Sequence, residues 1–299
     1  MKKALSVIVF CLAWASMAMA QGIAKNDCTL ESKILGTTTH YSVYLPQGYE
    51  TSSIDYPVLY LLHGGGDNWT DWLMKGQAAA IADREIASGE SVAMIIVMPD
   101  GMQNLYGNKA DGSFNYEDYF FKELIPAVEK TYRIKSDRQF RAISGLSMGG
   151  YGSLLYSLKH PDMFSACYGM SIGMFGKTRL SQPGFFLDWI ESYYGKRDKN
   201  GKVPKTFYDN DVYTLVENMP EQQKRMVNFC IECGDDELNR DQSEVFLLMK
   251  DKGVPVEVRI ADGAHNWIFW RKCLPHAMKW ASECFIQERS VPMGPTARP

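Results

Sequence analysis

The sequence predicts an α/β fold, in which a mostly parallel sheet is covered by helices on both faces. Apolar β-prone segments alternate along the chain with segments of helical spacing, which is the pattern of this class. The segments at 58–62 and 94–98 are apolar throughout, as strands buried on both faces are. The loops that follow such strands meet at the carboxyl edge of the sheet, where the sites of open α/β sheets lie.

The 299 residues are 45% hydrophobic, which is enough for one sizeable core. Residues 1–20 have the parts of a secretory signal peptide: two lysines, a short apolar stretch and the small-residue cleavage site Ala18-Met19-Ala20. We therefore expect a single domain over 21–288, a disordered tail at 289–299, and export to the periplasm or the medium. The apolar stretch is too short to span a membrane as a helix of the mature chain.

Charge and cysteines exclude several classes of function. The formal net charge is −3, and without a basic stripe nucleic acid is not an expected partner. The pair Cys230 and Cys233 has C-x-x-C spacing, but no second pair completes a zinc site. We predict buried or incidentally paired cysteines rather than metal or redox chemistry for the six that follow the signal peptide: Cys28, Cys167, Cys230, Cys233, Cys273 and Cys284.

Two β segments are expected at 33–39 and 40–45, after a short exposed lead-in that begins at residue 21. In the second segment Tyr41, Val43 and Leu45 alternate with His40, Ser42 and Tyr44, which predicts a half-buried strand. His40 is expected to be a surface or packing residue on this strand.

A glycine loop, His63-Gly64-Gly65-Gly66-Asp67-Asn68, follows the apolar strand at 58–62 directly. Glycine leaves the backbone N–H groups unobstructed, so such a loop can donate to the oxyanion that forms during acyl transfer. A plain turn is the alternative.

The segment at 101–116 follows the next apolar strand, at 94–98. It is polar, rich in Gly and Asn, and contains Tyr106. We predict a long loop at the edge of the sheet where substrate contacts normally lie. Residues 116–132 have apolar side chains at helical spacing and are predicted to form a helix.

The motif Gly145-Leu146-Ser147-Met148-Gly149 lies between a β-prone segment and a helical segment that ends before Pro161. A serine on a strained turn stands above the sheet, and glycine lets neighbouring backbone pass close to it. Ser147 as an ordinary helix N-cap is the alternative. Strand, G-x-S-x-G and helix in this order are typical of the nucleophile elbow of α/β-hydrolases, and they favour the oxyanion function for the glycine loop.

The rest of the chain continues the alternation of strands and helices. Residues 173–225 are the least regular part, and we interpret them as an insertion that packs beside or over the site. The other elements are predicted as strands at 164–172, 226–231 and 254–260, and as helices at 241–252 and 270–287, the last with Pro275 near its start.

A serine nucleophile needs a base, and the base needs an acid that fixes its tautomer. In α/β-hydrolases the chain order is serine, acid, histidine, so His63 is assigned a structural role in its loop. His265 lies after a predicted strand and before the last helix, and it is the predicted base. The acid is expected in the loop after the preceding strand, where three carboxylates are adjacent: Asp235, Asp236 and Glu237.

Six segments together resemble the esterase D family: LLHGGGDNWTDW, VMPDG, YEDYFFKELIPAVEKTYR, RAISGLSMGGYGSLLYSLKHPDMF, CGDDEL and DGAHNWIFW. This family includes the carbohydrate esterases of family 1, which are feruloyl and acetylxylan esterases, and the mycolyltransferases are relatives. The resemblance covers roughly residues 33–286. The hormone-sensitive-lipase group also has an HGGG loop, but its typical elbow, G-D-S-A-G, does not match this chain.

The resemblance implies a role for each matching residue. Ser147 would be the nucleophile, His265 the base, and the backbone N–H groups of Gly65 and Met148 the oxyanion donors. The family's acid lies in a G-x-x-D-x-L pattern, from which this chain departs by one residue. Anchoring the pattern on D-x-L selects Asp236, which is the prediction, and anchoring it on the glycine selects Glu237.

The implied function is a serine esterase that needs no metal or cofactor and acts on feruloyl or acetyl groups of plant polysaccharide, or on a small-molecule ester. Three aromatic residues of the loops, Trp69, Tyr106 and Trp267, are candidates for stacking on a sugar or a feruloyl group, with core or rim packing as the alternative. Two other functions stay open: an acyltransferase to a sugar, and a catalytically silent carbohydrate-binding relative. The sequence gives no oligomeric state.

Overall fold

The computed structural model describes residues 21–173, 185–238 and 240–286. The predicted signal peptide at 1–20 and tail at 289–299 lie outside these residues. None of the helices in the described ranges combines the length and the apolar character that crossing a membrane requires.

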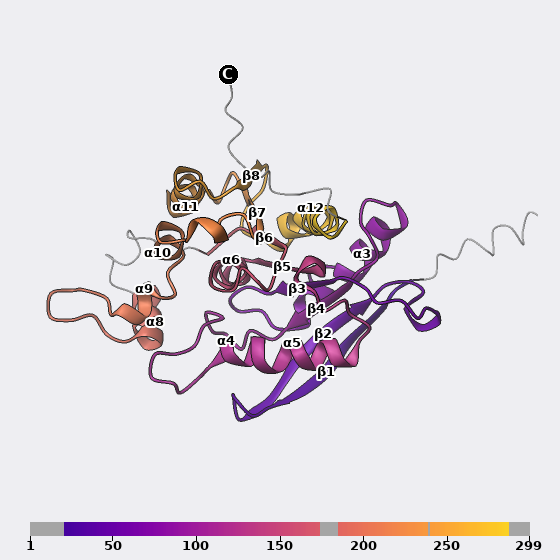
Figure 1. The fold of residues 1–299 in the computed structure, drawn as a ribbon, viewed down its shortest axis with the longest axis horizontal. Coiled ribbons are helices and arrows are strands. Elements are labelled where there is room, and N and C mark those ends of the chain that lie inside the picture. The colour runs from indigo at the N-terminus through magenta and orange to yellow at the C-terminus, as the bar shows by residue number, and fades with distance from the viewer. Residues whose placement is uncertain (1–20, 174–184, 239, 287–299) are drawn as a thin grey trace, which may run out of the picture.

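One eight-stranded sheet crosses the molecule in the order β1-β2-β4-β3-β5-β6-β7-β8 (Figure 1). The two strands at one edge, β1 and β2, are antiparallel, and the other six run parallel to one another. This confirms the predicted mostly parallel sheet. The strands are β1 (Ile23–Ser32), β2 (Thr37–Leu45), β3 (Val58–Leu62), β4 (Ile95–Pro99), β5 (Arg141–Leu146), β6 (Ala166–Met170), β7 (Asn228–Gly234) and β8 (Val256–Ala261).

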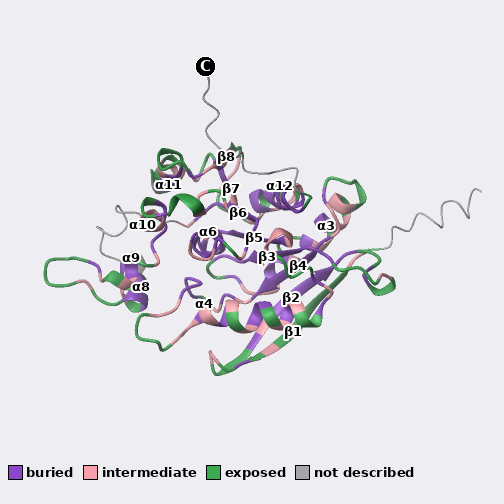
Figure 2. Cartoon of the chain, viewed as in Figure 1, coloured by how far each residue is buried: buried purple, intermediate pink, exposed green. Residues whose placement is uncertain are grey.

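Helices cover both faces of the sheet because side chains of the central strands alternate between two cores. Leu62 and Ile143, for example, belong to one core, and Leu61 and Ala142 to the other. Buried residues fill the central strands and the inner sides of the helices, whereas the edge strand β1 is mostly exposed (Figure 2). The first core is closed by α4 (Tyr116–Tyr119), α5 (Ile125–Thr131), α6 (Met148–Lys159), α10 (Val212–Glu217) and α11 (Arg240–Asp251), and the second by α2 (Asp71–Met74), α3 (Ala78–Ala87) and α12 (Trp267–Phe285).

The first strand differs from the prediction. Residues from Ile23 to Ser32 form β1 rather than an exposed lead-in, and they pair with β2 through a register shift between Lys25 and Cys28. Most of these side chains are exposed, so the strand is held by its backbone hydrogen bonds and lacks the apolar alternation by which a strand is identified in a sequence.

The helix predicted at 116–132 is continuous but not uniform. A π-helical turn, η2 (Phe120–Leu124), separates α4 from α5. Pro126 follows this turn and has no N–H to donate to the preceding turn, so the hydrogen-bond ladder is interrupted at this point.

The terminal helix begins three residues earlier than predicted. The Asn266 side chain accepts hydrogen bonds from the N–H groups of Ile268 and Phe269 at 3.0 and 3.1 Å, which caps α12 at Trp267. Pro275 consequently lies inside the helix rather than near its start.

The described part of the insertion contains α8 (Phe185–Tyr194), α9 (Lys205–Tyr208) and α10. It is bound to α6, because the Tyr151 hydroxyl donates to the Asn210 carbonyl at 2.6 Å and Lys159 Nζ donates to Asn210 Oδ1 at 2.7 Å. The described part of the insertion therefore packs against α6, and its packing beside or over the site stays a prediction.

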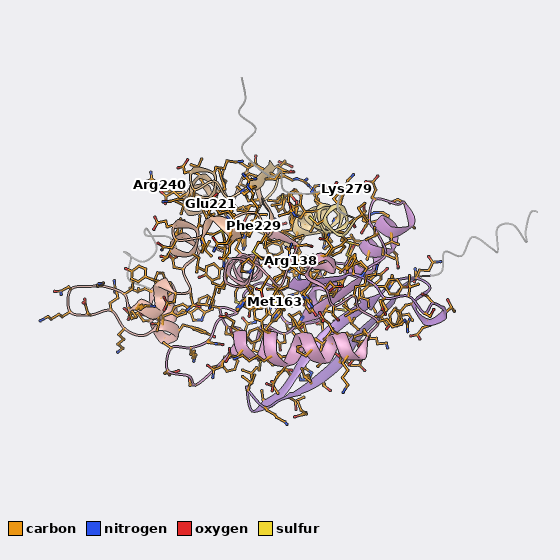
Figure 3. All side chains as sticks on the ribbon, viewed as in Figure 1. Arg138, Met163, Glu221, Phe229, Arg240 and Lys279 are labelled. Carbon is orange, nitrogen blue, oxygen red and sulfur yellow. The ribbon has the colours of Figure 1, made fainter. Side chains whose placement is uncertain are left out.

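Two arginines link the segments that lead into the strands, at the amino ends of the parallel strands. Arg138 donates to the Phe164 carbonyl at 3.2 Å and to the carbonyl of Met226, which precede β6 and β7 (Figure 3). Buried Arg141 donates to the Met163 carbonyl at 3.0 Å. The amino ends of the parallel strands are therefore fixed, and the carboxyl ends carry the site.

Candidate active site

Ser147 lies on a strained turn between β5 and α6, with φ 53° and ψ −114°. The turn is tight because glycines flank it. A Cβ on Gly145 would lie 2.5 Å from the Gly149 carbonyl, and a Cβ on Gly149 would lie 2.5 Å from the Leu62 carbonyl oxygen. Only glycine fits at either position, so the G-x-S-x-G spacing has the geometry of the predicted elbow.

His265 reaches Ser147 from the loop between β8 and α12. Its Nε2 lies 2.9 Å from Ser147 Oγ. The histidine is exposed and the serine is half-buried, so both side chains can be reached by substrate and by water. The structure thus brings together the two residues predicted as nucleophile and base.

The carboxylate that pairs with the histidine belongs to Glu237, and the prediction of Asp236 is wrong. Glu237 Oε2 lies 2.5 Å from His265 Nδ1. The Glu237 N–H closes a turn onto the Gly234 carbonyl at 3.3 Å, which leaves Asp235 and Asp236 exposed and directs the third carboxylate inward. The extra methylene of glutamate spans the remaining distance.

The second oxygen of Glu237 is also bound. Oε1 accepts hydrogen bonds from the Ser171 hydroxyl and, at 3.0 Å, from the Gly234 N–H. Burial alone would raise the pKa of this carboxyl, but the hydrogen bonds from His265, Ser171 and Gly234 outweigh it and hold the pKa below its ordinary value. Glu237 is therefore ionised at neutral pH.

Trp270 supports this group from α12. Its Nε1–H donates to Ser171 Oγ at 2.9 Å, and its ring stands edge-on to the His265 ring, with centroids 5.1 Å apart. The sequence analysis missed Ser171, which follows β6 and carries no motif, and it placed Trp270 only at the start of the last helix.

The glycine loop lies against the elbow. A Cβ on Gly64 would be 3.4 Å from Ser147 Cβ. No described residue accepts a hydrogen bond from the N–H of Gly65, and the N–H of Met148 opens the first turn of α6, where N–H groups have no partner within the helix. Both predicted oxyanion donors are thus available to a ligand.

Three side chains hold the glycine loop in place. His63 is buried and bonded on both nitrogens, with Nδ1 2.8 Å from the Gly64 carbonyl and Nε2 accepting from the Gly101 N–H at 2.7 Å. The Tyr106 hydroxyl donates to the His63 carbonyl at 2.8 Å. Gln103 accepts from the Gly66 N–H at 2.7 Å. The structural role predicted for His63 is confirmed.

The three predicted substrate-binding aromatics do not form one surface. Tyr106 is wholly buried, so its assignment to substrate is wrong: its hydroxyl is used to hold the glycine loop. Trp69 stacks on His40 with ring centroids 4.5 Å apart, which confirms a packing role for that histidine. Trp267 packs edge-on against Trp72. Trp69 and Trp267 are partly exposed, and their contact with substrate stays a prediction.

None of the six described cysteines takes part in a disulfide, and all but Cys28 are buried. Cys230 and Cys233 are three positions apart on β7, so their side chains point to opposite faces of the sheet and cannot bind one ion or each other. Burial raises the pKa of Cys233 to about 11, which keeps the thiol protonated. The prediction of buried cysteines is confirmed for the five other than Cys28.

Several known proteins are similar to this chain in sequence or in fold. A family model described as putative esterase matches residues 32–281. The chain is 30% identical over 257 residues to an endo-1,4-beta-xylanase/feruloyl esterase of Xylanibacter ruminicola, with 83% of this chain and 30% of that longer protein covered. It is 27% identical over 239 residues to an acetyl esterase of Caldicellulosiruptor saccharolyticus, with 78% of this chain and 86% of that protein covered.

Solved structures agree with these relatives. A ferulic acid esterase is 34% identical, with a TM-score of 0.77 over 88% of this chain and 99% of that one. A fluorophosphonate-binding serine hydrolase of Staphylococcus aureus shares the fold, with a TM-score of 0.73 at 22% identity over 88% of this chain and 99% of that one. The chain belongs to the putative esterase family and is a carboxylic ester hydrolase of the α/β-hydrolase fold.

Proposed function

We propose that this protein is an exported serine esterase that removes feruloyl or acetyl groups from plant polysaccharide through an acyl-enzyme on Ser147. The observation that carries the proposal is the position of His265, hydrogen-bonded to Ser147 Oγ on one nitrogen and to Glu237 on the other. The substrate class is supported by the names of the feruloyl and acetyl esterase relatives, and export by the signal-peptide pattern of residues 1–20.

In the first half-reaction Ser147 Oγ attacks the ester carbonyl carbon and its proton passes to His265 Nε2. This needs Nε2 to be free of a proton and Nδ1 to carry one, and the ionised Glu237 beside Nδ1 selects that tautomer. The imidazolium that forms is stabilised by the same carboxylate. It then gives its proton to the leaving alcohol as the C–O bond of the ester breaks.

The negative charge of the tetrahedral intermediate falls on the former carbonyl oxygen. The N–H groups of Gly65 and Met148 are the proposed donors to this oxygen, and each such donor is typically worth about 3 kcal/mol of transition-state stabilisation. In the second half-reaction water loses a proton to His265 and attacks the acyl carbon. The bond between the acyl carbon and Ser147 Oγ then breaks and His265 returns the proton to Oγ, which releases the acid and restores the serine hydroxyl. Water can approach because the histidine is exposed.

The proposal is tested by kcat/KM on methyl ferulate and on an acetylated xylo-oligosaccharide, with Ser147→Ala as the reference. We expect turnover of at least one substrate and loss of it in Ser147→Ala, with the thermal transition of the variant unchanged. A large preference for ferulate would indicate an acyl pocket built from aromatic residues, and preference for the acetyl ester a small pocket. Substantial activity in pure Ser147→Ala would contradict the mechanism.

A further inference from the structure

The acid of the site is a glutamate where aspartate is usual, and it is bound on both of its oxygens. We propose that the Ser171 hydroxyl, oriented by the Trp270 indole, is the positioning residue that lets glutamate serve as the acid here. This inference rests on the proposed function, because it concerns the same reaction. Ser171 acts through Glu237 and His265 and does not touch the reacting atoms.

Ser171 adopts a conformation that a serine rarely has without a reason. It follows β6, has φ 46° and is wholly buried. Positive φ disfavours a residue with a Cβ by roughly 1–2 kcal/mol, so glycine would be more stable at this position. Strain of this kind persists where the surrounding structure requires it, and it is common at active sites.

The hydroxyl of Ser171 is engaged as both donor and acceptor. It donates to Glu237 Oε1, and its oxygen accepts the Trp270 Nε1–H at 2.9 Å. A hydroxyl has one proton. Because an incoming indole N–H can bind only a lone pair, the proton of Ser171 is directed to the carboxylate.

Glutamate needs this support more than aspartate would. Its side chain has one more rotatable bond, and fixing such a side chain opposes folding by conformational entropy. The Ser171 hydroxyl and the Gly234 N–H both hold Oε1, so Oε2 stays directed at His265 Nδ1. Without one of them, Glu237 would lose the fixed direction on which the histidine tautomer depends.

The first test removes the hydroxyl in two ways. Ser171→Ala keeps the Cβ, and Ser171→Gly also relieves the positive φ. We expect both to lower kcat by on the order of tenfold with KM nearly unchanged, since a positioned hydrogen bond to a charged group contributes about this much. Trp270→Phe, which keeps a ring beside His265, should lower kcat in the same direction.

A matched control separates this role from a general effect on folding. Ser282 on α12 is also buried, and its hydroxyl lies 3.0 Å from that of Ser91 and accepts from the Val92 N–H at 3.0 Å. Ser282→Ala should lower the thermal transition and leave kcat unchanged. Full activity in both Ser171 variants would overturn the inference.

The second test is a double-mutant cycle with Glu237→Asp. The shorter side chain cannot reach Ser171 and His265 together, so Ser171→Ala should lower kcat by about tenfold with Glu237 present and by less than about twofold in the Glu237→Asp background. An equal loss in both backgrounds would show that Ser171 stabilises the fold and does not position the acid.

The pH profile gives a readout that a structural role would not change. Loss of a donor leaves the Glu237 carboxylate more negative toward His265, which favours the imidazolium, so the acid limb of kcat/KM should move to higher pH in Ser171→Ala. Titratable groups close to Glu237 include its chain neighbours Asp235 and Asp236 and the thiols of Cys233 and Cys273. Burial raises the pKa of both thiols, so they stay neutral in this range. An unmoved limb would contradict the inference.

The outcomes separate the inference from the proposed function. Residual activity in Ser147→Ala would overturn the acyl-enzyme mechanism whatever Ser171 does. An inactive Ser147→Ala together with a fully active Ser171→Ala would overturn only the role of Ser171.

Discussion

Three adjacent carboxylates follow β7, and only the third meets the histidine. Asp235 and Asp236 are exposed on the outside of the turn, while Glu237 points back toward the edge of the sheet. Glutamate reaches His265 from there because its side chain is one methylene longer. The identity of the acid is therefore decided by the direction of the turn as well as by the residue type.

Replacing Glu237 tests its role against its neighbour. Glu237→Gln keeps the shape but allows the amide to select the wrong histidine tautomer, so kcat should fall by roughly 10³–10⁴-fold. The matched variant Asp236→Asn should stay within about twofold of the parent. The measurement is kcat of the two purified variants on one ester substrate. A large loss in Asp236→Asn with little loss in Glu237→Gln would identify Asp236 as the acid.

At the scale of elements, the glycine loop depends on a neighbouring loop for its position. Gln103 accepts from the Gly66 N–H at 2.7 Å and donates to the Asp67 carbonyl at 2.5 Å. Its own backbone has φ 56°, so this loop is also strained where it supports the site.

Gln103→Leu should move the glycine loop and lower kcat by about tenfold with a smaller change in KM, because an oxyanion donor acts mainly in the transition state. The exposed Gln222 provides the control, and Gln222→Leu should leave both constants unchanged. Steady-state measurement of kcat and KM for both variants tests this prediction. A rise in KM alone in Gln103→Leu would mean that Gln103 contacts the substrate and does not hold the loop.

A buried ion pair joins α4 to α6. Glu117 accepts hydrogen bonds from Lys159 and from His160 at 2.7 Å. Burial alone would raise the pKa of Glu117, but these partners outweigh it and hold the pKa below its ordinary value. The pair therefore contributes stability above about pH 4.3, the unfolded value for glutamate, and this contribution is lost as the pH falls through the lower folded pKa.

Glu117→Gln should lower the free energy of unfolding by about 3 kcal/mol at pH 7, since it leaves the partly buried charge of Lys159 without its carboxylate partner. The difference from the parent should shrink as the pH falls below 4. Urea unfolding at pH 7 and at pH 3.5 measures both values. A difference that is the same at the two pH values would contradict the ionised pair.

At the scale of the whole molecule, residues that stabilise the sheet and residues that carry the chemistry lie at different places along the strands. Phe229 (labelled in Figure 3) is buried near the amino end of β7, while the catalytic groups follow the carboxyl ends of the strands. Phe229→Ala should lower the free energy of unfolding by about 3–5 kcal/mol and leave kcat per folded molecule unchanged at low temperature. Calorimetry and active-site titration measure the two effects. A loss of kcat in proportion to stability would show that core and site are coupled.

The sequence predicts most of this architecture because buried parallel strands are apolar throughout and loops at their ends carry Gly, Ser and His. Ser147 and His265 could be predicted since the elbow and the chain order fix both. The edge strand β1 could not, because its exposed side chains lack alternation. The role of Ser171 could not be predicted either. Its contact with Glu237 joins two loops that are 66 positions apart in the chain, and neither loop carries a sequence motif that indicates the contact.

The most direct test of the acyl-enzyme account is peptide mapping by mass spectrometry after treatment with a fluorophosphonate. The account predicts one modification, on Ser147, that is absent in Ser147→Ala and slowed in His265→Ala. Modification of another residue, or unchanged labelling of Ser147→Ala, would contradict it.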